Sequence, residues 1–374
     1  MQDTTYTATT WYRGCRTYKN PDMRRILLSI IVALHITACG RNTENADTTF
    51  SMDSFERITV PDSAGTKYHN DSIFLGNPHI IRFHPDGYLV LADVPNADQI
   101  TVIDLQSDKV QSLVKHGRGP AEIMSVRDLA IRDGDIWVTG IADQKIIRLT
   151  RGEGKREFEP ASYYRAKDQF LRAVPFTKGR ILTLASSSSG NRFHILDSEA
   201  TTRDTVGSFP STGRIAEVEP NNAIFQSDIT VAPNGEHTAA VCQSLEYIDI
   251  YDAEMGLTSR LHGPQGVEPA IKAVSTGLGT AFHQDPLWLI FNNPVSDNDR
   301  LMIGYIGIRV ESEEDFARQT NTVLSFGWDG KPLKAYEFES DIVSFDMDWK
   351  NNRMYCLANR PEPEILVYDL GDLE

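Results

Sequence analysis

The chain has 374 residues, of which 40% are hydrophobic and 24% are charged, and its formal net charge at pH 7 is −15. This composition is ordinary for a globular protein with a sizeable core, so disorder over the whole chain is excluded. The electrostatic field of a negatively charged protein repels the phosphate backbone of nucleic acids, and we therefore expect no nucleic-acid partner.

A secretory signal is predicted near the start of the chain. Two arginines follow Met23, and residues 26–36 form an apolar run that is interrupted at only two positions. A charged segment before an apolar run of roughly 7–15 residues is typical of a secretory signal, and a bilayer span needs about 20 residues. We interpret residues 23–38 as the signal peptide and the polar residues 1–22 as a mis-called extension before the true start.

The signal ends at residues 36–40, which read Ile-Thr-Ala-Cys-Gly and resemble the lipobox of bacterial lipoproteins. An ordinary signal peptide with a coincidental cysteine, or a buried strand, are the alternatives. The resemblance implies a diacylglycerol on Cys39 and a mature chain of net charge −18, because cleavage removes five basic and two acidic residues. A lipid-modified cysteine suffices as a membrane tether. We expect a cell-envelope protein anchored in the outer membrane and facing the periplasm, with the cell surface as the alternative.

Two segments follow the signal. Residues 39–52 are polar and without periodicity, which is typical of a flexible tether. Residues 53–374 consist of short β-branched and aromatic runs separated by turn signals such as Asp86-Gly87, the pattern of a many-stranded β domain.

The β domain repeats at a nearly fixed period. The last apolar residues before the first turn of each unit are spaced by 48, 45 and 55 residues. These marker residues are Phe83, Ile131, Phe176 and Val231. The next marker, Met347, lies 116 residues further along, which fits two units and places a less regular fifth repeat at about residues 272–338. Six repeats are therefore predicted.

The two ends of the domain are complementary. The sixth repeat has only three predicted strands, and residues 55–60 form an orphan strand at the other end. Propellers pair such ends in one blade, which closes the ring and removes exposed edges. The prediction is an all-β, six-bladed β-propeller with four-stranded blades, the last of them closed by the N-terminal strand.

Several segments match a known family. Residues 117–122 read Gly-Arg-Gly-Pro-Ala-Glu and resemble the stretch after the first blade of the six-bladed, TolB-like propeller lipoproteins of Bacteroidetes. Residues 326–332 resemble the turn of that family's fifth blade, and residues 344–369 resemble its last blade. The resemblance covers about residues 53–370 and implies the fold, lipidation and an envelope location. It implies no common activity.

Polar residues occupy the predicted entries to the innermost strands, which face the central channel of a propeller. Most are found three or four positions before the markers, and a histidine takes the corresponding place in the fifth repeat. These candidates are His79, Arg127, Asp128, Arg172, Asp228 and His283. They could line a binding pocket at one channel mouth, or they could pair with each other and with neighbouring backbone in a wet channel.

No strong catalytic motif is present in the sequence. The glycine-rich loop at residues 116–120 lacks the Gly-Lys-Ser/Thr ending of a phosphate-binding loop, so a tight turn is the better interpretation. No two histidines show the close spacing of a strong metal site. We assign no catalytic residue, metal ligand or cofactor, although a divalent metal held by residues of different blades is conceivable. Cys242 and Cys356 fall in apolar runs of different repeats and are expected to be buried thiols, with a disulfide as the alternative.

Two functions fit these features. The first is a non-catalytic binding or scaffold module for a protein, peptide or glycan partner, since catalytic signatures are absent. The alternative is a metal-dependent hydrolase, lactonase or lyase with its site at the channel mouth, because one fold serves many functions.

Overall fold

Strands make up nearly all of the regular secondary structure. The computed structural model describes residues 46–70, 73–93, 97–186, 191–210, 222, 224–276, 279–359 and 362–373. The predicted signal peptide, Cys39 and the start of the predicted tether lie outside this part of the chain. Within it, no helix has the length and apolar character that a membrane span requires.

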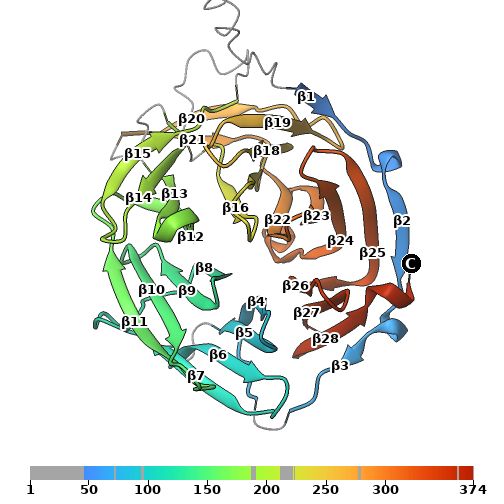
Figure 1. The fold of residues 1–374 in the computed structure, drawn as a ribbon. Helices are drawn as coiled ribbons and strands as arrows, with labels where there is room; N and C mark the ends of the chain where they lie inside the picture. The colour runs from blue at the N-terminus through green and yellow to red at the C-terminus, as the bar shows by residue number, and fades with distance from the viewer. Residues whose placement is uncertain are drawn as a thin grey trace, which may run out of the picture. The chain divides into compact units, whose positions relative to one another are not determined.

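Six blades surround a central axis, and the first strand of each blade lies innermost (Figure 1). Consecutive strands within a blade are antiparallel. Blades 1 to 6 are, in order, β4–β7 (Pro78–His84, Tyr88–Asp93, Asp98–Asp104, Val110–Lys115), β8–β11 (Asp128–Arg132, Asp135–Gly140, Lys145–Arg151, Phe158–Arg165), β12–β15 (Phe170–Pro175, Ile181–Ala185, Phe193–Leu196, Thr202–Val206), β16–β19 (Ser227–Val231, Thr238–Cys242, Tyr247–Tyr251, Leu257–His262), β22–β25 (Trp288–Ser296, Arg300–Arg309, Thr320–Gly327, Pro332–Ile342) and β26–β28 (Ser344–Asp348, Arg353–Asn359, Pro363–Asp369). The predicted six-bladed fold is confirmed.

The N-terminal segment runs along the outer edges of three blades in succession. β1 (Ala46–Thr49) lies parallel to β19 of blade 4, and β2 (Glu56–Val60) lies parallel to β25 of blade 5. β3 (Thr66–Lys67) pairs antiparallel with β28 and completes blade 6. We call residues 46–67 the N-terminal strap.

The strap corrects two predictions. An N-terminal strand does close the last blade, but the closing strand is β3, and the orphan strand at residues 55–60 belongs to blade 5. β3 is only two residues long and carries no hydrophobic pattern, which is why the sequence did not reveal it. The strap also begins at Ala46, inside the stretch 39–52 that was predicted to be a flexible tether.

One further difference concerns the repeats. The hairpin β20–β21 (Ile271–Thr276, Gly279–Gln284) pairs only with itself and precedes blade 5. This insertion lengthens the fifth repeat and explains its irregular spacing.

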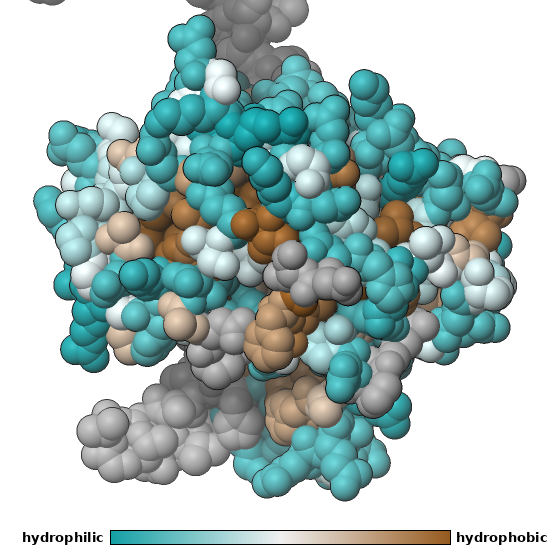
Figure 2. Space-filling model, turned by 90° about the horizontal axis from the view of Figure 1, so that it is seen from below, coloured by the Kyte–Doolittle hydropathy of each residue, from teal (hydrophilic) through white to brown (hydrophobic). Residues whose placement is uncertain are grey.

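The hydrophobic core lies between the blades. Clusters of buried side chains fill all six junctions of neighbouring blades, as Val90, Leu129 and Val138 do between blades 1 and 2. Central strands such as β5 are buried on both faces, so they appear in the sequence as unbroken apolar runs. The face drawn in Figure 2 is mostly hydrophilic, and its hydrophobic atoms show mainly in recesses. The innermost strands line the channel with both polar and aliphatic side chains.

The strap is anchored by an aromatic cluster, which gives a testable prediction. Phe50 is 4% exposed, and its ring contacts Phe55 and Phe326 edge-on at centroid distances of 5.8 and 5.2 Å. We expect Phe50→Ala to lower the free energy of unfolding by about 3–5 kcal/mol in urea titrations, because it leaves a cavity in a packed site. The matched control is Phe74→Ala, since Phe74 is 79% exposed. Equal effects of the two substitutions would contradict an anchored strap.

Candidate functional site

A cavity of about 1180 Å³ occupies the channel. Five of the six predicted candidates line it, namely His79, Arg127, Asp128, Arg172 and Asp228. His283 does not take the predicted position, because it lies on β21 of the separate hairpin, and its side chain is outside the described part of the structure. The innermost strand of blade 5 is β22, which contributes Asn293 to the lining.

The guanidinium of Arg172 bridges carboxylates of the two neighbouring blades. Arg172 lies on β12, and its Nε is 3.4 Å from Asp128 Oδ1 of blade 2 and 2.6 Å from Asp228 Oδ1 of blade 4. Asp128 Oδ2 also accepts a hydrogen bond of 3.2 Å from the backbone N–H of Ala173. These bonds join blades 2, 3 and 4 around the cavity.

Asp228 and Asn293 continue the connections through blade 5 to blade 6. Asp228 accepts hydrogen bonds from the backbone N–H of Asn293 and from Gln243 Nε2, the latter at 3.0 Å. Asn293 Nδ2 donates to the carbonyl oxygen of Phe345 at 2.8 Å, and its Oδ1 accepts from Ser344 Oγ at 2.7 Å. Asn293 has a φ of 46°, the left-handed conformation that asparagine tolerates better than most residues.

Blade 1 completes the ring on both sides. Asp346 Oδ2 of blade 6 accepts a hydrogen bond of 2.9 Å from the backbone N–H of Phe83. Arg82 Nε donates to the carbonyl oxygen of Leu129 in blade 2 at 3.0 Å, and His79 Nε2 lies 3.2 Å from the carbonyl oxygen of Val126. Every junction between neighbouring blades is thus crossed by a hydrogen bond from a channel side chain. We call this set of bonds the channel ring.

Arg127 is the exception among the channel arginines. In the part of the chain that the structure describes, its guanidinium forms no hydrogen bond or ion pair, and its Nε is buried without a partner. Its charge acts only at longer range, on His79, Asp128 and Asp228. Arg82 and Arg172 are committed to the channel ring, and the other two lining arginines bond elsewhere, Arg132 to the carbonyl oxygen of Ala232 and Arg353 to Asp369. Among the described residues, Arg127 is therefore the lining arginine that remains available to a ligand.

Burial changes the titration of the channel groups. Burial, aided by the charge of Asp228, raises the pKa of Asp128 to about 7. Burial also raises the pKa of Asp228 and Asp346 above the usual range for a carboxyl, and it lowers the pKa of His79, which is therefore neutral at pH 7. The cavity accordingly becomes more positive as the pH falls from 8 to 6.

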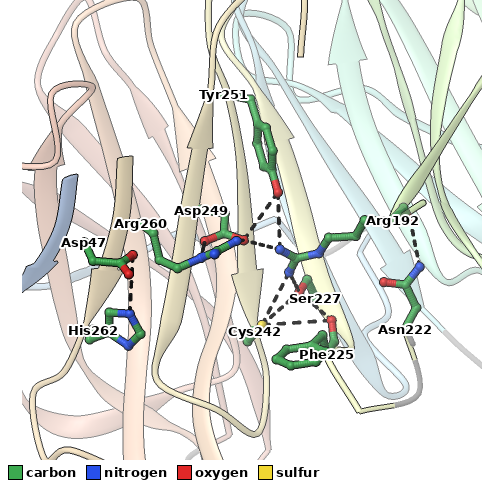
Figure 3. A network of polar contacts seen from close by, with 10 residues as sticks. All are labelled: Asp47, Arg192, Asn222, Phe225, Ser227, Cys242, Asp249, Tyr251, Arg260 and His262. Atoms are coloured by element: carbon green, nitrogen blue, oxygen red, sulfur yellow. Dashed lines mark hydrogen bonds and ion pairs between the residues drawn. The ribbon is translucent and has the colours of Figure 1, made fainter. Parts of the chain in front are cut away.

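A second polar network, which includes residues of β16, β18 and β19, stabilises the channel ring (Figure 3). Arg192 of blade 3 is fully buried, pairs with Asp249 of blade 4, and donates to Ser227 Oγ at 2.7 Å. Arg260 makes two hydrogen bonds to the same carboxylate, at 2.7 and 2.9 Å. Removing one partner of such a buried pair typically costs 3–5 kcal/mol. Because Ser227 precedes Asp228 on β16, this network fixes the strand that carries Asp228.

The two cysteines that the structure describes do not form a disulfide, as predicted. Cys242 and Cys356 are both buried. Cys242 lies within the same network, with its Sγ 3.2 Å from Ser227 Oγ, and burial raises the pKa of its thiol. A fully buried thiol of raised pKa is inert, so Cys242 has a structural role.

The glycine-rich loop is a structural turn. Glu122 folds back under the loop, where its Oε2 accepts a hydrogen bond of 2.7 Å from the backbone N–H of Gly119. A Cβ at Gly117 or Gly119 would collide with this carboxyl group. Lys145 Nζ donates to the carbonyl oxygens of Gly119 and Glu122 at 2.7 and 2.6 Å. The loop is therefore filled by its own chain, which supports the turn interpretation.

The channel residues do not fit a divalent metal. Across the described residues, no three His, Cys, Asp or Glu side chains come together as metal ligands. Arg172 contacts both Asp128 and Asp228 and thereby supplies the positive charge that a metal would supply between them.

The family follows from fold and sequence together. The family described as TolB-like 6-blade propeller-like matches the chain over residues 55–350. The chain belongs to this family. No functionally curated protein matches this TolB-like propeller in sequence.

Solved structures similar to this TolB-like propeller are distant. A Bacteroides fragilis protein described as exported has 12% identity and a TM-score of 0.49, with 84% of this chain and 99% of that chain covered. A streptogramin B lyase has 14% identity and a TM-score of 0.45, with 80% and 95% covered. A virginiamycin B lyase from Staphylococcus aureus has 15% identity and a TM-score of 0.42, with 77% and 83% covered. At these values the similarities say nothing about activity.

Sequence reasoning missed Arg82, Asn293 and Asp346 in the channel of this TolB-like propeller. Arg82 and Asp346 each directly precede a marker residue, so a search one position before the markers would have found them. Asn293 was hidden because the inserted hairpin shifted the count in the fifth repeat.

The raised pKa of Asp128 predicts how stability depends on pH. Its folded-state pKa of about 7 exceeds the unfolded value, so the folded state binds the extra proton between about pH 4 and 7 and loses stability as the pH rises through that window. We expect Asp128→Asn to flatten this decline in urea titrations at several pH values, with the remaining slope due to Asp228 and Asp346. The exposed Asp299→Asn should leave the slope unchanged. Parallel curves for wild type and Asp128→Asn would contradict the assignment.

Proposed function

We propose that the protein is a lipid-anchored binding module of the cell envelope, which receives a protein, peptide or glycan partner at its central cavity without transforming it. The observation that supports this proposal is that most charged residues of the channel bond to other blades, whereas one arginine does not. The carboxylates, Arg82 and Arg172 are committed to holding blades together, and Arg127 alone among the channel arginines is left for a partner.

The same bonding pattern argues against the alternative of a hydrolase, lactonase or lyase. A general base must change its protonation during a reaction within reach of the substrate. Asp128, Asp228 and Asp346 instead accept backbone hydrogen bonds from the next blade, and losing these bonds would weaken the ring. A metal-dependent mechanism has no supporting ligand set among the described residues.

The membrane anchor in this proposal rests on the sequence. Residues 36–40 carry the lipobox pattern after an apolar run, and the mature chain would have a net charge of −18. A chain of negative net charge is not attracted electrostatically to anionic lipids, so the lipid on Cys39 would be the anchor. We infer an outer-membrane location facing the periplasm.

Lipidation has a direct test with a matched control. In a Bacteroidetes host grown with a palmitate analogue, we expect the wild-type protein to be labelled and to sediment with membranes, and Cys39→Ser to lose both properties. Cys15→Ser should behave as wild type, because Cys15 precedes the inferred start at Met23. Labelling of the Cys39→Ser variant would refute the anchor.

Partner binding at the cavity can be tested by photo-cross-linking. Ser125 is exposed and lies two positions before Arg127, whereas Ser112 is exposed on β7, the outer strand of blade 1. With p-benzoylphenylalanine at either position in the full-length protein, irradiation of intact cells should give a specific adduct from position 125 and none from position 112. No adduct, or the same adducts from both positions, would count against a partner at the channel.

A further inference from the structure

The uncommitted charge of Arg127 narrows the chemistry of the ligand. A guanidinium presents a planar fork of donors that matches a carboxylate or a phosphate. Arg172 is already paired with Asp128 and Asp228, and burial lowers the pKa of the neighbouring His79, so neither adds an uncommitted positive charge to that of Arg127. A single negative charge on a planar group is therefore the best match.

The net negative charge of the whole chain disfavours the binding of polyanionic ligands. The net charge of −15 repels a polyanion at a distance, whereas a ligand of one charge loses little on approach. Inside the cavity that charge would meet the guanidinium of Arg127, which forms no hydrogen bond or ion pair within the described part of the chain. The ligand is thus small or presents a single charged end.

The rest of the cavity adds an apolar requirement. Aliphatic side chains from blades 2 to 5 line it further along the innermost strands, and these are Ile131, Val174, Val231 and Val295. Arg127 and Ile131 are four positions apart along the chain, which corresponds to about 13 Å at the rise of a strand. An extended peptide of about four residues covers the same length. A carboxylate at one end and apolar side chains about four residues away are the features of a peptide C-terminus.

Resting on the binding function proposed above, we propose that the channel binds the C-terminal end of a peptide, with its terminal carboxylate on Arg127 and its apolar side chains against the aliphatic lining. The channel ring holds Arg172 and Arg82 in place, so the carboxylate of the peptide meets one uncommitted guanidinium, that of Arg127. Acidic sugars share the carboxylate but lack the apolar side chains.

The test is affinity selection of a peptide library on the mature full-length protein, read by mass spectrometry. The probes are randomised acetylated tetrapeptides, supplied as free acids and as C-terminal amides. We expect acids to be selected at least tenfold over amides, with Val, Ile or Leu enriched at the first two positions. Arg127→Ala should reduce selection of acids at least tenfold, as the loss of a charge-assisted hydrogen bond predicts, and Arg127→Lys should retain part of it.

Controls separate this proposal from the broader binding function. Arg165→Ala, at an exposed end of β11, should select as wild type does. Equal selection of acids and amides, no selection, or selection that survives Arg127→Ala in a folded protein would overturn the proposal. Binding of digalacturonate that depends on Arg127, with no peptide selected, would also overturn it in favour of an acidic sugar. A specific cross-link at position 125 would uphold the binding function even then.

Discussion

The propeller depends on closing a ring whose centre has no hydrophobic core. Apolar side chains hold each blade to its neighbours, but the innermost strands face a channel that charged and polar side chains line together with aliphatic ones. There the structure uses side chains to satisfy the backbone of the next blade, as Asp128 does for Ala173 and Asp346 does for Phe83. Buried polar groups without partners are costly, so nearly every group in the channel is committed. This constraint decides which residues remain for function.

The need to pair backbone groups also explains the arrangement at the outer edge of the ring. Blade 6 would lack its outer strand without β3, and the strap that delivers β3 first covers the edges of blades 4 and 5. Covered edges cannot pair with another chain. If Cys39 carries the lipid, the strap would also join the propeller to its anchor, and the packing of Phe50 would keep a pull on the anchor from opening blade 6.

The sequence predicted the repeats well because the hydrophobic pattern and the turns are local signals. The markers Phe83, Ile131, Phe176 and Val231 all precede the first turns of real blades. The two-residue strand β3 could not be placed, since tertiary position alone gives it its pairing. The hairpin β20–β21 pairs locally, but that it lies outside the blades is a tertiary feature that the sequence did not reveal. Five of the six channel candidates reach the cavity. The sequence could not distinguish the residues of the channel ring from the uncommitted Arg127, because Arg127 and Arg172 lie at the same offset before their markers. That distinction required the interatomic distances in the structure.

The central claim is that four of the five arginines lining the channel bond to the protein's own groups, and that Arg127 is the one available to a ligand. It is tested most directly by NMR of the guanidinium groups, which reports how fast each rotates about its Nε–Cζ bond. The account predicts slow rotation for Arg172 and Arg82, fast rotation for Arg127, and slowing of Arg127 alone when a peptide acid is added. Slow rotation of Arg127 in the free protein, or fast rotation of Arg172, would contradict the account.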